Sequence, residues 1–244
     1  MAVLSIGGFD PSCAAGICAD IRTFTKLKVD YCTVLTSITA QNKNGVRGVK
    51  FLTPNFVKEQ LQSVCEEKKI NVVKIGMLGT VRIVHVVADF LKEKQIPSVL
   101  DPVMSAQAGG ALMRGGCMEA IRKNLLPFVM VATPNLYETK RLTNIDVKSI
   151  NDAKRASLIL PCRTAVIKGI RAGARIYDVV RDGSNFKVFS KQYIPTSTRG
   201  GGCVFASAIA SYLSQGYGPM RTVELAEKFI SHAIRKSQGG VVYP

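Results

Sequence analysis

Short apolar runs alternate with amphipathic segments along the first two-thirds of the chain. The runs are rich in β-branched residues and predict strands at Val3–Gly7, Cys32–Thr39, Val72–Ile75, Val99–Pro102, Val129–Ala132 and Ala165–Ile167. Between them, apolar residues recur at spacings of three and four, which predicts helices at Ala14–Leu27, Pro54–Lys68, Val81–Lys94, Met118–Asn124 and Ile150–Leu160. This alternation indicates an α/β fold, with helices on both faces of a mostly parallel sheet.

The pattern changes after Gly169. The segments Arg175–Arg181 and Phe186–Gln192 flank the turn-rich tetrapeptide Asp182-Gly183-Ser184-Asn185, so they predict a β-hairpin. Helices are predicted to follow at Gly202–Gln215 and Met220–Ser237. No internal repeat or linker interrupts the 244 residues, and we expect a single domain that spans 1–244.

Composition and charge narrow the class of protein. A hydrophobic content of 47% suffices for a large core. The net charge is +16, but the basic residues are scattered on the polar faces of the predicted helices, and the chain has no Trp. We therefore expect a basic surface that attracts anionic small molecules, with no nucleic-acid partner. The apolar run at the start is too short for a signal peptide or membrane span, which predicts a cytoplasmic protein with no membrane partner.

Cys203 stands apart from the other cysteines. The seven cysteines are scattered without a CxxC spacing, so they indicate neither a disulfide framework nor a zinc site, and most are expected to be apolar core residues. Cys203 directly follows Gly200-Gly201-Gly202 at a predicted helix start. Such a turn lets backbone N–H groups converge on an anion. We expect the helix dipole to lower the pKa of this thiol and make it a proton acceptor, although glycine turns before helices are common.

Polar residues at other predicted element ends each have a structural alternative. Asp101 and Lys168 lie at the carboxyl ends of predicted strands, where open α/β sheets bind ligands. Asp10, ahead of Pro11-Ser12, is also a helix-start signal, and Asn135 is also a candidate N-cap of a short helix Leu136–Leu142.

The order of these motifs resembles that of the hydroxymethylpyrimidine/phosphomethylpyrimidine kinases of thiamine biosynthesis, members of the ribokinase-like superfamily. The resemblance covers nearly the whole chain. It rests on Gly7-Gly8-Phe9-Asp10-Pro11-Ser12, Ala15-Gly16-Ile17-Cys18-Ala19-Asp20, Ile38-Thr39-Ala40-Gln41-Asn42, Lys74-Ile75-Gly76-Met77-Leu78, Leu100-Asp101-Pro102-Val103-Met104, Thr133-Pro134-Asn135-Leu136-Tyr137-Glu138, Val166-Ile167-Lys168-Gly169 and Arg199-Gly200-Gly201-Gly202-Cys203. It implies a ribokinase-like three-layer α/β/α sandwich.

The resemblance also implies roles for individual residues. It places Gly8, Asp10, Ala15, Gln41, Met77 and Val103 around the pyrimidine, with the stretch from Gln41 to Val49 as a flap. The Gln41 amide offers both a donor and an acceptor, which matches the edge of an aminopyrimidine ring. Lys168, Asn135 and Arg199 would contact the phosphates of ATP, Asp101 and Glu138 would hold Mg²⁺, and Cys203 with Gly200, Gly201 and Gly202 would form the catalytic centre.

The activity that this resemblance implies is phosphorylation of 4-amino-5-hydroxymethyl-2-methylpyrimidine and its monophosphate by ATP with Mg²⁺, in a homodimer. Pyridoxal kinase activity and a non-catalytic pyrimidine-binding role are the alternatives. The chain departs from the family pattern where Cys13-Ala14 replaces paired glycines, where Gly201 replaces threonine and where Ile170 interrupts a Lys-Gly-Gly pattern. If the backbone at 13 and 14 needs positive φ, these side chains introduce strain.

Overall fold

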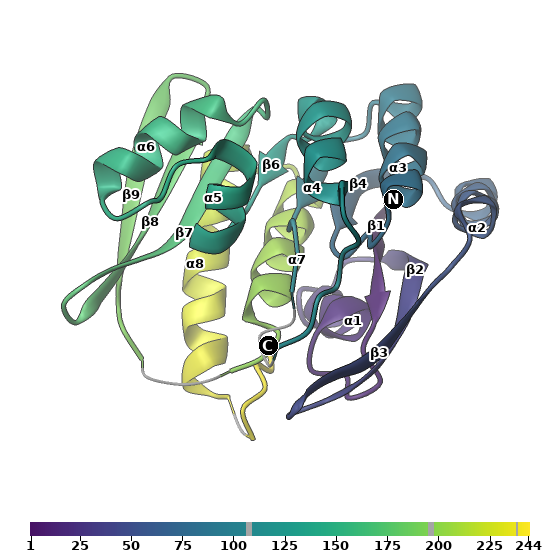
Figure 1. The fold of residues 1–244 in the computed structure, drawn as a ribbon, viewed down its shortest axis with the longest axis horizontal. Helices are drawn as coiled ribbons and strands as arrows, with labels where there is room; N and C mark the ends of the chain where they lie inside the picture. Colours follow the sequence, from purple (N-terminus) through teal and green to yellow (C-terminus); the bar gives the residue numbers. More distant parts are fainter. Residues whose placement is uncertain (106–108, 195–197, 238) are drawn as a thin grey trace.

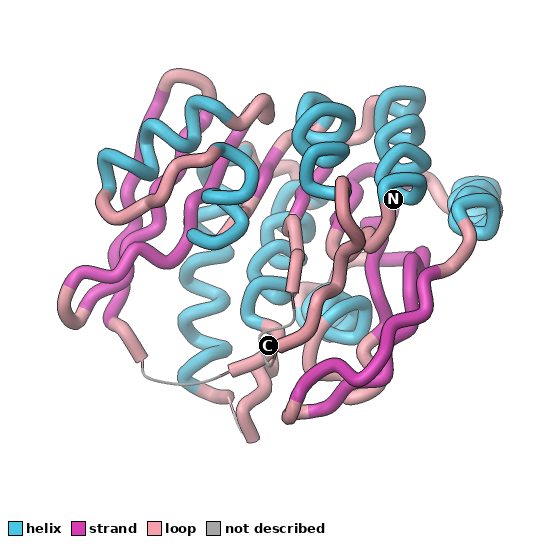
Figure 2. Tube along the Cα trace, in the orientation of Figure 1, coloured by secondary structure: helices cyan, strands magenta, loops and turns pink. Residues whose placement is uncertain are grey.

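A single mostly parallel sheet organises the chain (Figure 1). The structure is a computed structural model and describes all residues except 106–108, 195–197 and 238. Within the described residues the sheet order is β3-β2-β1-β4-β5-β6-β7-β8-β9. The strands are β1 (Ala2–Phe9), β2 (Tyr31–Asn42), β3 (Gly45–Phe51), β4 (Ile70–Ile75), β5 (Ser98–Leu100), β6 (Val131–Ala132), β7 (Thr164–Ala172), β8 (Arg175–Asp182) and β9 (Asn185–Gln192). In sheet order, the strands from β2 to β7 are parallel. Antiparallel pairs, β2 with β3 and β7 to β9, close the two edges. Figure 2 shows these strands in magenta between the helices.

Helices cover both faces of this sheet (Figure 1). They are α1 (Gly16–Lys26), α2 (Pro54–Glu67), α3 (Val81–Lys94), α4 (Cys117–Ala120), α5 (Leu136–Thr143), α6 (Ile150–Ile159), α7 (Gly201–Ser214) and α8 (Pro219–Arg235). Consecutive strand residues point to opposite faces. Leu100 accordingly packs in the core with α3, while Val99 packs in the core with α7 and α8. The predicted three-layer α/β/α architecture is therefore confirmed.

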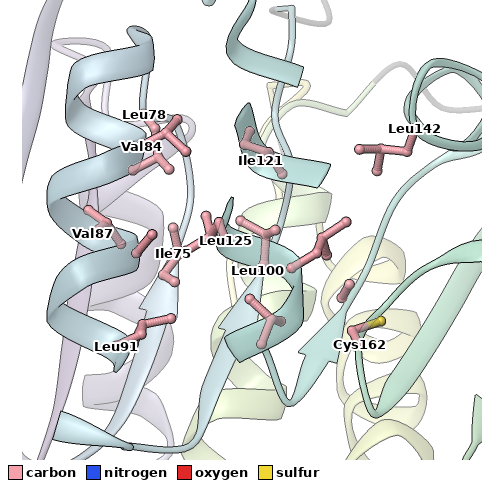
Figure 3. Packing of buried hydrophobic residues seen from close by; sticks show 14 of the residues in the cluster. Ile75, Leu78, Val84, Val87, Leu91, Leu100, Ile121, Leu125, Leu142 and Cys162 are labelled. Atoms are coloured by element: carbon pink, nitrogen blue, oxygen red, sulfur yellow. The ribbon is translucent and has the colours of Figure 1, made fainter. Parts of the chain in front are cut away.

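The core under α3 shows how the sequence pattern becomes packing (Figure 3). Val84, Val87 and Leu91 repeat at spacings of three and four, and all three are buried against Ile75 and Leu100 of the sheet. Burial of each such side chain stabilises the fold by roughly 1.5–3 kcal/mol before entropy is counted. The Thr80 side chain accepts a hydrogen bond from the Ile83 backbone N–H and so fixes the start of this helix.

One strand was not predicted, and one predicted helix has a different form. Gly45–Phe51 forms strand β3, which pairs with β2; its apolar residues Val46, Val49 and Phe51 are only half-buried and are separated by glycine and basic residues, so they give no strong apolar signal. The role of this stretch as a flap stays a prediction. The predicted helix Met118–Asn124 is α-helical over Cys117–Ala120, widens into a π-helical segment over Ile121–Leu125 and then tightens into a 3₁₀ turn that contains Pro127. Proline has no N–H for the helix ladder, so an α-helix does not continue through this point.

Within the part of the chain that the structure describes, none of the helices combines the length and apolar character that crossing a membrane requires.

Candidate active site

The predicted site residues meet at two neighbouring cavities, and all except Gly8 and Met77 line the larger one. The larger cavity has a volume of 390 Å³ and is lined by Asp10, Ala15, Gln41, Asp101, Val103, Asn135, Glu138, Lys168, Arg199, Gly200, Gly201, Gly202 and Cys203. A neighbouring cavity of 60 Å³ shares Asp10, Ala15, Gln41, Val103 and Cys203 with it and adds Gly8 and Met77. Cys203 lines both cavities and so lies where the wide outer cavity meets the narrow inner one. The combined volume of the two cavities is large enough for a small ligand.

The glycine turn before α7 packs closely on its neighbours, and at Gly200 only glycine fits. Gly200 has φ of +87°, and a Cβ there would lie 2.0 Å from the carbonyl oxygen of Ala14. A Cβ on Gly202 would lie 3.2 Å from a carboxylate oxygen of Asp101. The first N–H groups of a helix lack intrahelical partners, and no side chain caps this helix start. The turn is therefore suited to bind an anion such as a phosphoryl group.

The environment of Cys203 contradicts the expected lowering of its pKa. Burial raises the pKa of the Cys203 thiol to about 11, and the negative charges of Asp20 and Asp101 act in the same direction. The Lys74 ammonium and a hydrogen bond from the Gly16 backbone oppose this shift. Desolvation therefore outweighs Lys74 and the Gly16 backbone hydrogen bond, and Cys203 is a protonated thiol at neutral pH in this structure.

Lys168 extends from β7 into the outer cavity. Its Nζ lies 3.2 Å from Oδ1 of Asp101 and 3.4 Å from Oγ1 of Thr133. Burial opposes the positive charge, but Asp101 and then Glu138 outweigh it and raise the pKa of Lys168. The side chain is therefore a cation next to the anion-binding turn.

Asn135 and Glu138 cap the start of α5. The Glu138 N–H donates to Oδ1 of Asn135 at 2.9 Å, and the Asn135 N–H donates to Oε2 of Glu138 at 2.9 Å. The N-cap interpretation of Asn135 is thus confirmed as a capping box. Burial, followed by the charge of Asp101, raises the pKa of Glu138 to about 7, although Lys168 opposes the shift.

The two carboxylates suit Mg²⁺ because together they exceed the charge of Lys168. Mg²⁺ prefers hard oxygen ligands, keeps several waters and needs only one or two carboxylates. Among residues 1–105, 109–194, 198–237 and 239–244, no group of three or more His, Cys, Asp or Glu side chains is arranged to hold a metal. Asp101 and Glu138 therefore fit a largely hydrated Mg²⁺ rather than an ion enclosed by protein ligands.

Asp10 organises the loop between β1 and α1. Its Oδ1 accepts hydrogen bonds from the Ser12 N–H at 2.9 Å and the Ser12 hydroxyl at 2.7 Å, and its Oδ2 accepts one from the Ala15 N–H at 3.0 Å. Asp10 thus holds the loop before α1 and the N–H of its N-cap residue, but no side chain caps the first helical N–H groups, so neither Asp10 nor Ser12 acts as the helix cap that the sequence predicted. Cys13 in this loop has φ of +53°, as expected from the departure there, whereas Ala14 is not among the residues with positive φ.

The inner cavity is shaped by Gly8 and Met77. A Cβ on Gly8 would lie 2.9 Å from Sδ of Met77, so the glycine leaves room for this buried thioether. Ser37 contacts the same sulfur through its Oγ at 3.4 Å. Gln41 reaches the cavity from the end of β2, where the register with β3 shifts between Ala40 and Gln41. A flat ring with polar edges would meet a sulfur and an amide in this space.

The sequence analysis missed a buried ion pair beside Cys203. Lys74 Nζ lies 2.8 Å from Oδ2 of Asp20, and both residues line the inner cavity. The hydroxyls of Ser5 and Ser207 donate to Asp20 at 2.6 and 2.8 Å. A lysine inside an apolar strand is rarely fully buried without a partner, so Lys74 was the available signal.

A second missed feature is apolar. Ile176 of β8, Phe205 of α7, and Ile230 and Ile234 of α8 line the outer cavity. Ile176, Ile230 and Ile234 come from segments that carry no recognised motif, whereas Phe205 lies two residues after the glycine–cysteine motif in α7. Together they give the outer cavity a surface on which a flat aromatic group can lie.

Comparison with known proteins gives consistent results. The family model for phosphomethylpyrimidine kinase matches residues 10–241. The hydroxymethylpyrimidine/phosphomethylpyrimidine kinase of Streptomyces coelicolor is 36% identical over 236 residues, which cover 95% of this chain and 88% of that protein. The pyridoxal kinase of Staphylococcus aureus, solved in complex with AMP-PCP and pyridoxal, has a TM-score of 0.89 at 31% identity and is matched over 97% of this chain and 88% of that one.

One relative is much longer. The thiamine biosynthesis bifunctional protein ThiED of Geobacter sulfurreducens is 37% identical over 243 residues, covering 97% of this chain. The chain spans about half the length of that relative, 49%.

Proposed function

Because the chain belongs to the phosphomethylpyrimidine kinase family, we propose that it transfers the γ-phosphoryl group of ATP to the hydroxymethyl group of 4-amino-5-hydroxymethyl-2-methylpyrimidine, and then to the resulting monophosphate. The observation that carries the proposal is the meeting of two cavities at Cys203. One contains the glycine turn and Lys168, and the other contains Met77 and Gln41.

The charges of the outer cavity favour a triphosphate there. The N–H groups at the start of α7 and the Lys168 ammonium offer positive potential along one wall. Ile176, Ile230 and Ile234 offer apolar surface for the base, and Arg199 adds charge at the rim. Asp101 and Glu138 would hold Mg²⁺, which would neutralise charge on the phosphates during transfer. Positive groups that face the transferred phosphoryl stabilise the transition state more than the ground state.

Cys203 orients the acceptor hydroxyl at the boundary between the cavities. The thiol is protonated at rest, so it acts as a proton acceptor only in its thiolate form. Lys74 and the Gly16 backbone N–H favour that form. The Gln41 amide donates to and accepts from the aminopyrimidine edge.

A second candidate function is pyridoxal kinase activity. It is favoured by the likeness to the Staphylococcus aureus enzyme, whose structure contains AMP-PCP and pyridoxal. Gln41 favours the aminopyrimidine, because pyridoxal presents a pyridine nitrogen, a phenol and an aldehyde instead. Phosphorylation of the two alcohols side by side, with ATP and Mg²⁺, distinguishes them. We expect faster turnover of the pyrimidine, and pyrimidine binding without ATP turnover would indicate a non-catalytic relative.

Replacement of Cys203 tests its role. We expect Cys203→Ala to lower kcat by about 10²-fold or more, in the range of general acid–base contributions. Cys162→Ala is the matched control, because Cys162 is also a buried thiol with its pKa raised to about 11, but it packs in the core on the other face of the sheet. Undiminished kcat in Cys203→Ala, with both variants folded by circular dichroism, would remove Cys203 from the mechanism.

The proposal also includes a homodimer, which light scattering after size-exclusion chromatography tests.

A further inference from the structure

Two cysteines face each other in the loop that leads from β1 into α1. The sulfur atoms of Cys13 and Cys18 are 3.2 Å apart, and both residues are free thiols. Cys13 is exposed, whereas Cys18 is half-buried in the first turn of α1. A disulfide requires an S–S distance of about 2.05 Å, so the two sulfurs need to approach by only about 1 Å.

The surroundings of the pair assign different chemistry to its two members. Burial, followed by the hydrogen bond and charge of Cys13, raises the pKa of Cys18 to about 12. An oxidant in solution reaches the exposed Cys13 first, while Cys18 stays protonated behind it. The Arg22 guanidinium donates a hydrogen bond to the Cys13 carbonyl oxygen and lies 5.0 Å from the centre of the Tyr243 ring. The Arg22 charge partly opposes the raised pKa of Cys18.

The loop that carries Cys13 supports the anion-binding turn. A Cβ on Gly200 would lie only 2.0 Å from the carbonyl oxygen of Ala14, so this glycine packs directly against the loop. The Ser12 hydroxyl accepts a hydrogen bond from Arg199 at 3.2 Å, and Asp10 holds the Ala15 N–H. A covalent bond that draws Cys13 toward α1 therefore acts on the backbone against which Gly200 packs. The positive φ of Cys13, +53°, is a left-handed conformation that a side chain disfavours, so the backbone of this loop is already strained at Cys13.

We propose that Cys13 and Cys18 are an oxidisable dithiol, and that their disulfide slows phosphotransfer by displacing the support of Gly200. The slowing of phosphotransfer rests on the proposed kinase function. With hydrogen peroxide as oxidant, the Cys13 thiol releases its proton and the thiolate attacks one peroxide oxygen; the O–O bond breaks, and the departing hydroxide takes up that proton as water, which leaves a sulfenic acid. The Cys18 sulfur then attacks the Cys13 sulfur, and the S–O bond breaks with loss of a second water. In total, two thiols and one peroxide give one disulfide and two waters, and the two electrons from sulfur reduce the peroxide.

Thiol mapping on the full chain tests the bond itself. No Lys or Arg lies between the two cysteines, so trypsin leaves both in one peptide that ends at Arg22. After treatment with hydrogen peroxide and then iodoacetamide, we expect this peptide to be lighter by two hydrogens and to carry no alkyl group. Dithiothreitol should restore two alkylation sites. A peptide that still takes up two alkyl groups after peroxide would overturn the proposal.

Activity and ATP affinity test the consequence. We expect peroxide to lower turnover and to weaken ATP binding, measured by calorimetry, by several-fold, with recovery in dithiothreitol. Cys13→Ser and Cys18→Ser should resist this change, whereas Cys65→Ser, a half-buried thiol away from the loop, should respond as the wild type does. Unchanged ATP affinity in the disulfide form would contradict the proposed effect of the disulfide. So would a peroxide-induced loss of turnover and ATP affinity in Cys13→Ser and Cys18→Ser that equals the loss in the wild type. Because mapping and ATP affinity need no phosphotransfer, failure of the kinase function is distinguishable from failure of this proposal.

Discussion

Two lysine–aspartate pairs border the active-site cavities, and they differ in how completely their charges are balanced. Lys74 and Asp20 are one cation and one anion, and Asp20 also accepts hydrogen bonds from Ser5 and Ser207. Lys168 faces two carboxylates instead, Asp101 and Glu138. Its contact with Asp101 is longer, 3.2 Å against 2.8 Å for the Lys74 pair.

The difference separates a structural pair from a ligand-binding one. Although burial disfavours its charge, the pKa of Lys74 is raised, because Asp20 more than compensates. The pKa of Glu138 is raised to about 7, because burial and Asp101 leave its negative charge without a full counterpart. The first pair has its donors and acceptors matched inside the protein. The second has surplus negative charge, which an added cation can neutralise.

The largest expected effect comes from breaking the balanced pair. Lys74→Met leaves the Asp20 carboxylate buried without its cation, and removal of one partner from a buried ion pair costs about 3–5 kcal/mol. We expect a loss of this size in the free energy of unfolding, measured by urea denaturation. The double variant Lys74→Met/Asp20→Asn is the control, because it removes the unpaired charge and should regain part of the loss. A Lys74→Met protein as stable as the wild type would show that the pair is not balanced as described.

The fold was largely predictable from the sequence, because the alternation of elements sets the sheet and its faces. The parallel strands β5 and β7 are covered by helices on both faces, so their sequences are continuous apolar runs. Val99 in β5 and Val166 in β7 are examples of their fully buried residues. Strand β3 (Gly45–Phe51) escaped prediction because it is an edge strand with no fully buried residue, in which glycine and basic residues interrupt the apolar ones. Its place depends on pairing with β2 and not on its own pattern.

The site was predictable as a set of positions but not as a set of charges. The order of the motifs along the chain predicted that Cys203 and Lys168 share one site, and both line the same cavity. The raised pKa of Cys203 was not predictable, because it depends on burial and on Asp20 and Asp101, which lie far away along the chain. The pairing of Lys74 with Asp20 likewise joins residues that are 54 positions apart. Only the folded structure shows which charges face one another.

Titration of Glu138 tests whether the Lys168 pair carries the surplus negative charge that the Lys74 pair lacks. The expected effect is smaller than that of Lys74→Met. In the fold its pKa is about 7, whereas the ordinary value is 4.5, so between these pH values the folded chain holds more protons than the unfolded chain. The contribution of Glu138 to stability is therefore present below pH 4.5 and is lost as pH rises through 7. Because Mg²⁺ needs the ionised carboxylate, we expect Mg²⁺ affinity to be roughly tenfold weaker at pH 6 than at pH 8.

Thermal unfolding with and without Mg²⁺ measures this effect without any kinase assay. The Mg²⁺-dependent rise in Tm should be larger at pH 8 than at pH 6, and Glu138→Gln should abolish most of it. Glu119→Gln is the matched control, since Glu119 is an exposed carboxylate paired with Lys123. Mg²⁺ stabilisation that is independent of pH, or that survives in Glu138→Gln, would assign the surplus charge to another group.

The smallest expected effect comes from removing a hydroxyl that contacts the aspartate of each pair. Ser207 donates to Asp20 at 2.8 Å, and Thr133 contacts Asp101 at 3.3 Å, and both hydroxyl-bearing residues are fully buried. Ser207→Ala should lower the free energy of unfolding by about 1–2 kcal/mol, because a buried carboxylate loses a short hydrogen bond. Thr133→Val should cost about 1 kcal/mol less, because the longer bond is weaker and Asp101 keeps Lys168. Equal losses in urea denaturation would mean that Asp101 depends on its neighbours as strongly as Asp20 does, and the Lys168 pair would then be structural as well.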